Sequence, residues 1–205
     1  MNIEVKNSAK AVDYLESMKF LEKRVQDVFF EKGKELLWIL EHNSVYTAGT
    51  NAKLIDVIDK NLKVIKTNRG GKHTYHGPGQ KVVYFVLNLN KRGKNIRQLV
   101  TNIENCIIDV LKEYKIKSYP DKNNIGIWTK HKKDSAKIAS IGIKVKKWVA
   151  YHGFSLNVSN DLNKYNSIVP CGIKDVKITS LKEMGITNYI NIEKIIAEKF
   201  LNIFP

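Results

Sequence analysis

The chain has 205 residues, of which 43% are apolar and 27% are charged. That size fits one domain with a buried core, and the composition is too apolar for a disordered chain. The longest apolar run, residues 82–87, is too short to cross a bilayer. The N-terminal residues carry alternating charges and no apolar block of the signal-peptide type. We therefore expect a single cytoplasmic domain over residues 1–205, with no membrane partner.

The formal net charge is +15, from 35 basic and 20 acidic residues. Such a field attracts acidic partners, but 31 of the basic residues are lysine and only four are arginine. Arginine is preferred for reading phosphates and bases, and the chain has no nucleic-acid-binding or nucleotide-binding motif. We expect no nucleic-acid partner. A basic face for an acidic carrier protein and the codon bias of an AT-rich genome both remain open as explanations.

Hydrophobic periodicity and turn residues predict the elements in chain order. The expected helices cover residues 8–32 and 96–114, two short segments at 161–165 and 180–184, and a final helix at 192–203. The expected strands cover residues 35–40, 62–67, 81–89, 125–129, 136–145 and 148–158. Because helices alternate with strands and the late strands follow one another through tight turns, we expect an α/β or α+β fold with a mixed sheet flanked by helices.

Residues 69–80 form the most informative stretch. It contains four glycines, one arginine and two histidines, in the order Arg69, Gly70, Gly71, Lys72, His73, Thr74, Tyr75, His76, Gly77, Pro78, Gly79 and Gln80. Glycine is selected where the main chain turns sharply or lets a ligand approach closely. A buried strand or an ordinary surface loop needs none of these features, so the run predicts one wall of a binding site.

The two cysteines differ in context. Cys106 lies beside the apolar stripe of the helix expected at residues 96–114, where a thiol is usually a small core residue. Cys171 lies between Pro170 and Gly172, which predicts a loop. On that context alone an incidental thiol is the simpler interpretation, although a neighbouring cation would activate Cys171 as a nucleophile. The two have no metal-ligand spacing, and we expect neither a disulfide nor a metal site.

Three side chains are candidates for that cation: His76, Lys137 and His152. Lys137 lies in an alternating strand segment, on the face shared with Ser135, Ala139 and Ile141. Lysines are almost never buried unless they are paired, so a lysine facing inward would be unusual. For each of the three, a structural role is the competing interpretation.

These segments together resemble the lipoyl(octanoyl) transferase family. The run from Arg69 to Gln80 is similar to the family signature, and residues 42–49 to its first loop. Residues 137–142, 152–158 and 170–173 resemble its lysine segment, its next strand and its nucleophile loop, and residues 179–181 follow as in the family. The similarity spans about residues 35–185 in the expected order. The match departs from the family at His73, where an apolar residue is usual, and at Ser155, where alanine is usual.

The resemblance implies a fold akin to the catalytic domains of biotin–protein and lipoate–protein ligases. It also implies that Cys171 carries the acyl group as a thioester and that Lys137 lowers the pKa of that thiol. The substrate-binding residues that it implies are Arg69, Gly70, Gly71, Lys72, His73, Thr74, Tyr75, His76, Ser140, Ile141, Gly142, Gly153, Phe154 and Ser155. An apolar acyl chain needs small residues where main chains come close, which is consistent with these glycines.

The implied reaction moves an octanoyl group from octanoyl-acyl carrier protein to a lysine of a lipoyl domain, as in the 2-oxoacid dehydrogenases and the glycine cleavage H protein. It needs no cofactor, since thioester exchange and amide formation require no ATP. We expect the protein to act as a monomer. The nearest alternative is an ATP-dependent lipoate or biotin ligase of similar fold, although the ending His76 to Gln80 differs from a ligase phosphate loop.

Overall fold

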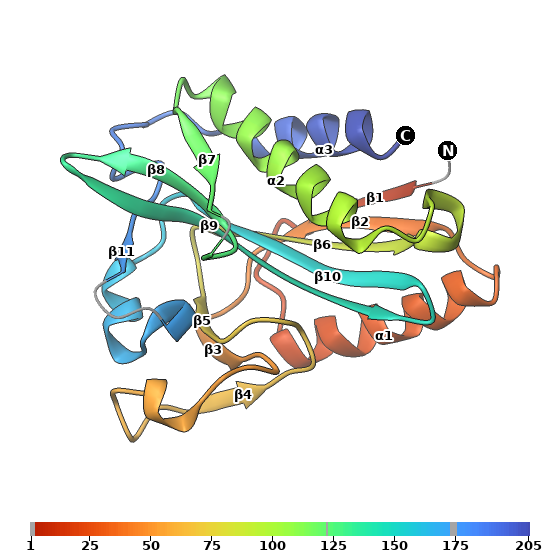
Figure 1. Ribbon diagram of the computed structural model, residues 1–205, viewed down its shortest axis with the longest axis horizontal. Coiled ribbons are helices and arrows are strands. Elements are labelled where there is room, and N and C mark those ends of the chain that lie inside the picture. The colour runs from red at the N-terminus through yellow and green to blue at the C-terminus, as the bar shows by residue number, and fades with distance from the viewer. Residues whose placement is uncertain (1–2, 122, 173–175) are drawn as a thin grey trace.

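A computed structural model describes residues 3–121, 123–172 and 176–205, with the side chain of Cys171 also outside the description. Within these residues eight strands form a main sheet (Figure 1). Its order is β1 (Ile3–Asn7), β2 (Glu35–Leu40), β6 (Gln80–Asn88), β10 (Val149–Asn157), β9 (Asp134–Lys146), β8 (Ile127–His131) and β7 (Ser118–Pro120), with β11 (Lys177–Ile178) paired to β9. Strand β1 is parallel to β2, and β11 is parallel to β9. All other neighbouring strands are antiparallel, so the sheet is mixed.

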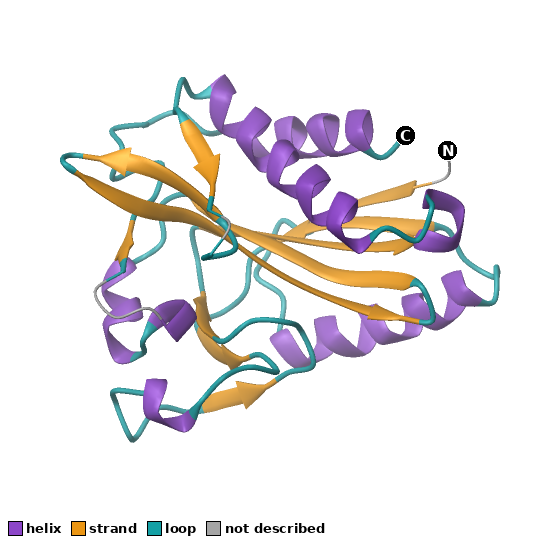
Figure 2. Ribbon diagram, in the orientation of Figure 1, coloured by secondary structure: helices purple, strands orange, loops and turns teal. Residues whose placement is uncertain are grey.

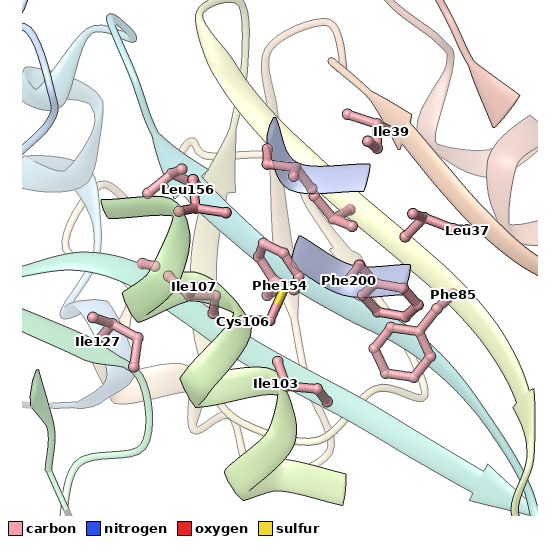
Figure 3. Close-up of a cluster of buried hydrophobic side chains, with 14 of the residues drawn as sticks. Leu37, Ile39, Phe85, Ile103, Cys106, Ile107, Ile127, Phe154, Leu156 and Phe200 are labelled. Carbon is pink, nitrogen blue, oxygen red and sulfur yellow. The ribbon is translucent and has the colours of Figure 1, made fainter. Parts of the chain in front are cut away.

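Helices cover both faces of the main sheet (Figures 1 and 2). Helix α1 (Tyr14–Phe29) packs its buried side chains on one face, against residues of β2, β6 and β10. Helices α2 (Ile96–Glu113) and α3 (Ile192–Ile203) cover the other face. Figure 3 shows the larger core on that side, where Phe85, Phe154 and Phe200 surround the thiol of Cys106. The prediction that Cys106 is a core residue is confirmed, and burial raises the pKa of its thiol to about 12.

A smaller sheet lies beside the main one and has the order β4 (Val64–Lys66), β3 (Val45–Ala48) and β5 (His73–His76). Four short 3-10 turns lie between the strands and helices: η1 (Leu54–Asp56) between β3 and β4, η2 (Leu89–Arg92) between β6 and α2, and η3 (Leu162–Ser167) and η4 (Pro170–Gly172) between β10 and β11. Strand β5 packs against η4, so the glycine-rich run and the segment that contains Cys171 are neighbours. The smaller sheet therefore positions part of the candidate site.

The mixed sheet flanked by helices is confirmed, and several boundaries agree closely with the prediction. Strand β2 and helix α3 have the predicted bounds, and Asn95 caps α2 by accepting a hydrogen bond from the Gln98 amide at 3.0 Å. The turn between β9 and β10 lies at Lys147 and Trp148, which both have a positive φ of 50° and 60°. That conformation is typical of two-residue hairpin turns.

Two helix predictions were wrong in part. The first helix begins at Tyr14 rather than near residue 8, because the side chain of Asp13 caps it by accepting a hydrogen bond from the Glu16 amide. Residues 8–13 are not helical and connect β1 to this helix. The short helix expected at residues 180–184 is only a set of turns: the Met184 amide bonds to the Ser180 carbonyl as in an α-helix, but the Gly185 and Ile186 amides bond to the carbonyls of Lys182 and Leu181 and do not continue that pattern.

Among the described residues, no helix combines the length and the apolar character that crossing a bilayer would require.

Candidate active site

A cavity of about 510 Å³ lies where the smaller sheet meets β6, β9 and β10. The predicted residues that line it are Arg69, Gly70, Gly71, Lys72, His73, Thr74, His76, Lys137, Ser140, Ile141, Gly142, Gly153, Phe154 and Ser155. Gly172, the residue after Cys171, lines it as well. The fold therefore brings the glycine-rich run, the β9–β10 hairpin and the residue after Cys171 to one cavity.

Small residues on adjacent strands form the floor of the cavity. Gly142 on β9 lies directly opposite Gly153 on β10, and Ser140 lies opposite Ser155. On the next strand, β6, Tyr84 pairs with Gly153, and Val82 pairs with Ser155. A side chain at Gly142 would lie about 3.0 Å from the carbonyl oxygen of Gly70. The cavity therefore exists because this part of the sheet carries almost no side-chain volume.

The glycine-rich run forms the opposite wall. The Gly70 amide donates a 2.9 Å hydrogen bond to the carbonyl of Ile143 on β9, which holds the run against the sheet. The Arg69 guanidinium donates to the carbonyls of Thr47, Gly70 and Lys72 and to the Thr47 hydroxyl, at 2.8–3.1 Å. Arg69 thus fixes the shape of the loop, in addition to lining the cavity.

Tyr75 is the exception among the predicted binding residues, because it is not among the residues that line the cavity. Its side chain packs on Tyr46 and Tyr165, and its hydroxyl lies 3.0 Å from the Ser44 hydroxyl. Successive side chains of a strand point to opposite sides, so Tyr75 faces away from its neighbours Thr74 and His76, which line the cavity. We correct the prediction accordingly and place Tyr75 in the support of the smaller sheet.

Lys137 is buried, with 1% of its surface exposed, and it lines the cavity. Its ammonium donates a 2.8 Å hydrogen bond to the carbonyl of Ile125 and lies 5.2 Å from the ring centroid of Trp128. The pairing of β8 with β9 shifts at this point: Trp128 faces Lys137, and Ile127 faces Ala139. Ser135, expected on the same face, is exposed. The predicted inward-facing lysine is present, held where the sheet is irregular.

The segment that contains Cys171 borders the same cavity through Gly172. Cys171 lies in η4, and the Gly172 amide donates to the carbonyl of Val169 at 3.0 Å. This bond occupies the Gly172 amide. Gly172 has a φ of +63°, and a side chain there would collide with the side chain of Lys72. Lys72 therefore lies against the segment that contains Cys171, whereas the Cys171 side chain and Ile173 lie outside the described residues.

Three histidines line the cavity, and burial lowers the pKa of each. The pKa falls to about 3 for His76 and for His152, and it is lowered for His73. His152 donates from Nε2 to Asn68 Oδ1 at 2.6 Å, and His76 donates from Nδ1 to Gln80 Oε1 at 2.7 Å. These imidazoles are therefore neutral near pH 7. They do not supply the cation that would activate a thiol, so of the three candidates named from the sequence only Lys137 is left.

Several cavity residues were not predicted from the sequence. They include Tyr14, Asn51, Asn123, Asn124, Val82, Tyr84, Val100, Ile125 and Ile143. The alternation of β6 places Val82 and Tyr84 on one face, and that pattern could have indicated them. Tyr14 and Val100 come from two different helices, and no spacing in the sequence relates those helices to the glycine-rich run. Within the described residues, no three His, Cys, Asp or Glu side chains gather as a metal ion would require.

Comparison with known proteins agrees with this geometry. The family model of the lipoyl protein ligase A/B catalytic domain matches residues 13–202. The chain is 46% identical to an octanoyltransferase of Ehrlichia chaffeensis, covering 98% of this chain and 96% of the relative. It is 42% identical to an octanoyltransferase of Wolbachia pipientis, covering 96% of this chain and 97% of the relative. The chain belongs to the lipoyl protein ligase A/B catalytic domain family, and the resemblance read from the sequence is confirmed.

Solved structures show the same fold. A lipoate-protein ligase A bound with ATP superposes with a TM-score of 0.75 at 13% identity, covering 100% of this chain and 86% of that one. A putative lipoate protein ligase from T. acidophilum with bound lipoic acid gives a TM-score of 0.72 at 14% identity, covering 100% and 86%. At these identities the likeness establishes the fold alone. The expected similarity to lipoate–protein ligases is therefore confirmed at that level.

Proposed function

We propose that this protein is an octanoyltransferase of lipoate formation that works through a thioester on Cys171. The donor is octanoyl-acyl carrier protein, and the acceptor is a lysine on the lipoyl domain of a 2-oxoacid dehydrogenase or on the glycine cleavage H protein. The observation that carries this proposal is that Lys137, the glycine-rich run and Gly172 line one cavity with an apolar and small-residue floor. Sequence relatives named octanoyltransferases support the transfer of an octanoyl group.

In the first step, the Cys171 thiolate attacks the donor thioester carbonyl. The carbon–sulfur bond to the carrier breaks, the carrier leaves as a thiolate that takes up a proton from water, and the octanoyl group remains on Cys171. A cysteine reacts as the thiolate, and a nearby ammonium stabilises that form. Lys137 is the buried cation that lines this cavity, and we assign it the role of lowering the pKa of the Cys171 thiol.

In the second step, the acceptor amine attacks the new thioester. The amine loses a proton, an amide forms, and Cys171 leaves as the thiolate that Lys137 again stabilises. An amide is more stable than a thioester, so this step is downhill without ATP. We place the octanoyl chain along the floor formed by Ser140, Gly142, Gly153 and Ser155, with Arg69 holding the opposite wall in place.

The test is an intact mass measurement after mixing the protein with octanoyl-acyl carrier protein alone. We expect a mass increase equal to one octanoyl group, and none in the Cys171→Ser variant. A second reaction contains free octanoate and ATP in place of the carrier-bound donor. An adenylate-forming ligase would convert these to octanoyl-adenylate and release pyrophosphate. An unmodified native protein, an octanoylated Cys171→Ser protein, or pyrophosphate release would each count against the proposal.

A further inference from the structure

Three large aliphatic side chains are exposed together beside the active-site segment. Leu54, Ile55 and Ile58 are 88%, 85% and 60% exposed. We call these three residues the η1 patch, because they lie in and directly after η1 (the orange turn at the lower left of Figure 1). Among the described residues, no other five-residue segment exposes three large hydrophobic side chains. Grouped exposure of this kind marks an interaction surface more often than scattered exposure does.

The η1 patch is joined by its main chain to the segment that leads to Cys171. The Ile58 amide donates to the carbonyl of Ser167 at 3.0 Å, and the Val169 amide donates to the carbonyl of Asp56 at 2.7 Å. Val57 and Ile168 form an antiparallel bridge between these two bonds. On its other side, the patch follows Asn51, which lines the cavity. The patch is therefore fixed beside the cavity, without lining it.

The charge around the η1 patch is basic. Lys53, Lys60, Lys63 and Lys66 are all exposed, and among the described residues none of them is in an ion pair. The same stretch has two acidic residues, Asp56, which is partly buried, and Asp59, whose carboxylate accepts the amide of Asn61 at 2.9 Å. Exposed apolar side chains in a stretch of chain that is rich in exposed lysines fit a partner that presents apolar residues among carboxylates.

From these features we propose that the η1 patch and its lysines dock the acyl carrier protein that brings the octanoyl group. This inference rests on the proposed function. A carrier protein is acidic and holds its acyl group on a long, flexible arm, so its body can sit beside the cavity while the arm enters. An acceptor lysine has a short side chain, and its domain must cover the mouth of the cavity itself. The position of the patch beside the cavity therefore favours the donor over the acceptor.

The test compares two donors in single-turnover acylation of the full-length protein: octanoyl-acyl carrier protein, and octanoyl-pantetheine, which has an arm but no protein body. For a Leu54→Ser/Ile55→Ser variant, we expect the half-saturating concentration of the carrier-bound donor to rise about tenfold. Acylation by octanoyl-pantetheine is expected to stay unchanged. A Lys60→Glu/Lys63→Glu variant is expected to weaken the carrier in the same way and to reduce the salt dependence.

Two matched controls come from elsewhere in the chain. Ile190 is 83% exposed, so Ile190→Ser removes an equally exposed aliphatic side chain. Lys19 and Lys23 are exposed on α1, and Lys19→Glu/Lys23→Glu makes the same change in net charge. Both controls are expected to match the native protein with either donor. If they weaken the carrier as much as the patch variants do, the effect is not local and the proposal is overturned.

Other outcomes also decide the question. Unchanged use of the carrier-bound donor by the patch variants overturns the proposal, as does equal loss with both donors. Slower transfer from a preformed acyl-enzyme to the lipoyl domain, with normal acylation, would assign the patch to the acceptor and also overturn it. Binding of fluorescent holo-carrier without an acyl group is measured in parallel. This binding measurement tests the docking surface independently of catalysis. A native protein that binds the carrier but forms no acyl-enzyme would refute the proposed function and leave the docking surface supported.

Discussion

Gly126 lies against the side chain of Lys137. A methyl group at residue 126 would fall 2.7 Å from Cε and 3.2 Å from Nζ of that lysine, and 2.6 Å from the carbonyl oxygen of Ala139. Gly126 also has a φ of +136°, which side-chain-bearing residues rarely adopt. The position of the buried ammonium therefore depends on a glycine directly before β8. The missing side chain leaves room for Lys137 to reach the carbonyl of Ile125.

The Gly126→Ala variant is expected to displace Lys137 and to slow acylation of the enzyme at neutral pH. It is also expected to lower the free energy of unfolding by about 1–3 kcal/mol, because of its backbone conformation. Gly185→Ala is the matched control: its φ is +83°, and a methyl group there meets nothing within 4 Å. Both variants should lose stability, and only Gly126→Ala should lose activity. Equal activity in the two would show that the glycine does not position the lysine.

Lys137→Met keeps the shape of the side chain and removes the cation. An unassisted cysteine is only a few per cent thiolate at pH 7, so we expect acylation to slow by about 30-fold. The rate should recover as the pH is raised, because hydroxide then supplies the thiolate that the ammonium no longer stabilises. The measurement is the rate of acyl-enzyme formation from pH 6 to 10, with Lys146→Met, an exposed lysine of the same strand, as control. A native rate in Lys137→Met would remove the lysine from the mechanism.

Gly142→Ala tests whether the floor of the cavity sets the acyl chain length. The added methyl group would meet the Gly70 carbonyl at 3.0 Å and Arg69 Cδ at 3.3 Å, so it narrows the space between the sheet and the glycine-rich wall. We expect the ratio of kcat/KM for hexanoyl donors to kcat/KM for octanoyl donors to rise about tenfold, which is the effect of one methyl group in an apolar pocket. Ser155→Ala keeps the floor small and is expected to leave this ratio nearly unchanged. An unaltered ratio in Gly142→Ala would place the acyl chain elsewhere.

The buried histidines predict a loss of stability in mild acid. Burial lowers the pKa of His76 and of His152 to about 3, whereas an unfolded histidine titrates near 6.5. Below pH 6.5 the unfolded chain therefore binds protons that the folded protein does not, and folding weakens as the pH falls. Between pH 7 and 5 each histidine is expected to remove about 2 kcal/mol from the free energy of unfolding.

Urea unfolding at pH 7, 6 and 5, at constant ionic strength, measures this effect. The His152→Gln variant carries one titrating group fewer, so its decrease between pH 7 and 5 should be smaller by about 2 kcal/mol. A native stability that stays constant between pH 7 and 5 would contradict the burial-driven neutral state of these imidazoles.

The local features of the fold could be predicted because each depends on neighbours in the chain. The apolar spacing of residues 192–203, the cap at Asn95 and the apolar run of β2 all carry their own signals. Strands β1, β3, β5, β7 and β11 are short or polar, and pairing with distant segments makes them strands. Their sequences alone could not predict them, since strand propensity depends strongly on the packing context.

For the site, residue types in the glycine-rich run and around Lys137 and Cys171 indicated the chemistry from the sequence alone. Which side of a strand faces the cavity was decided by tertiary structure. Tyr75 points away from it, and His152, with a φ of 67°, packs its ring on Tyr151, donates to Asn68 and lines the cavity. The opposition of Gly142 and Gly153 also arises only from strand register. Chemical identity belongs to single residues, but an enclosed volume is created where segments far apart in the chain pack together, and only the folded structure sets that packing.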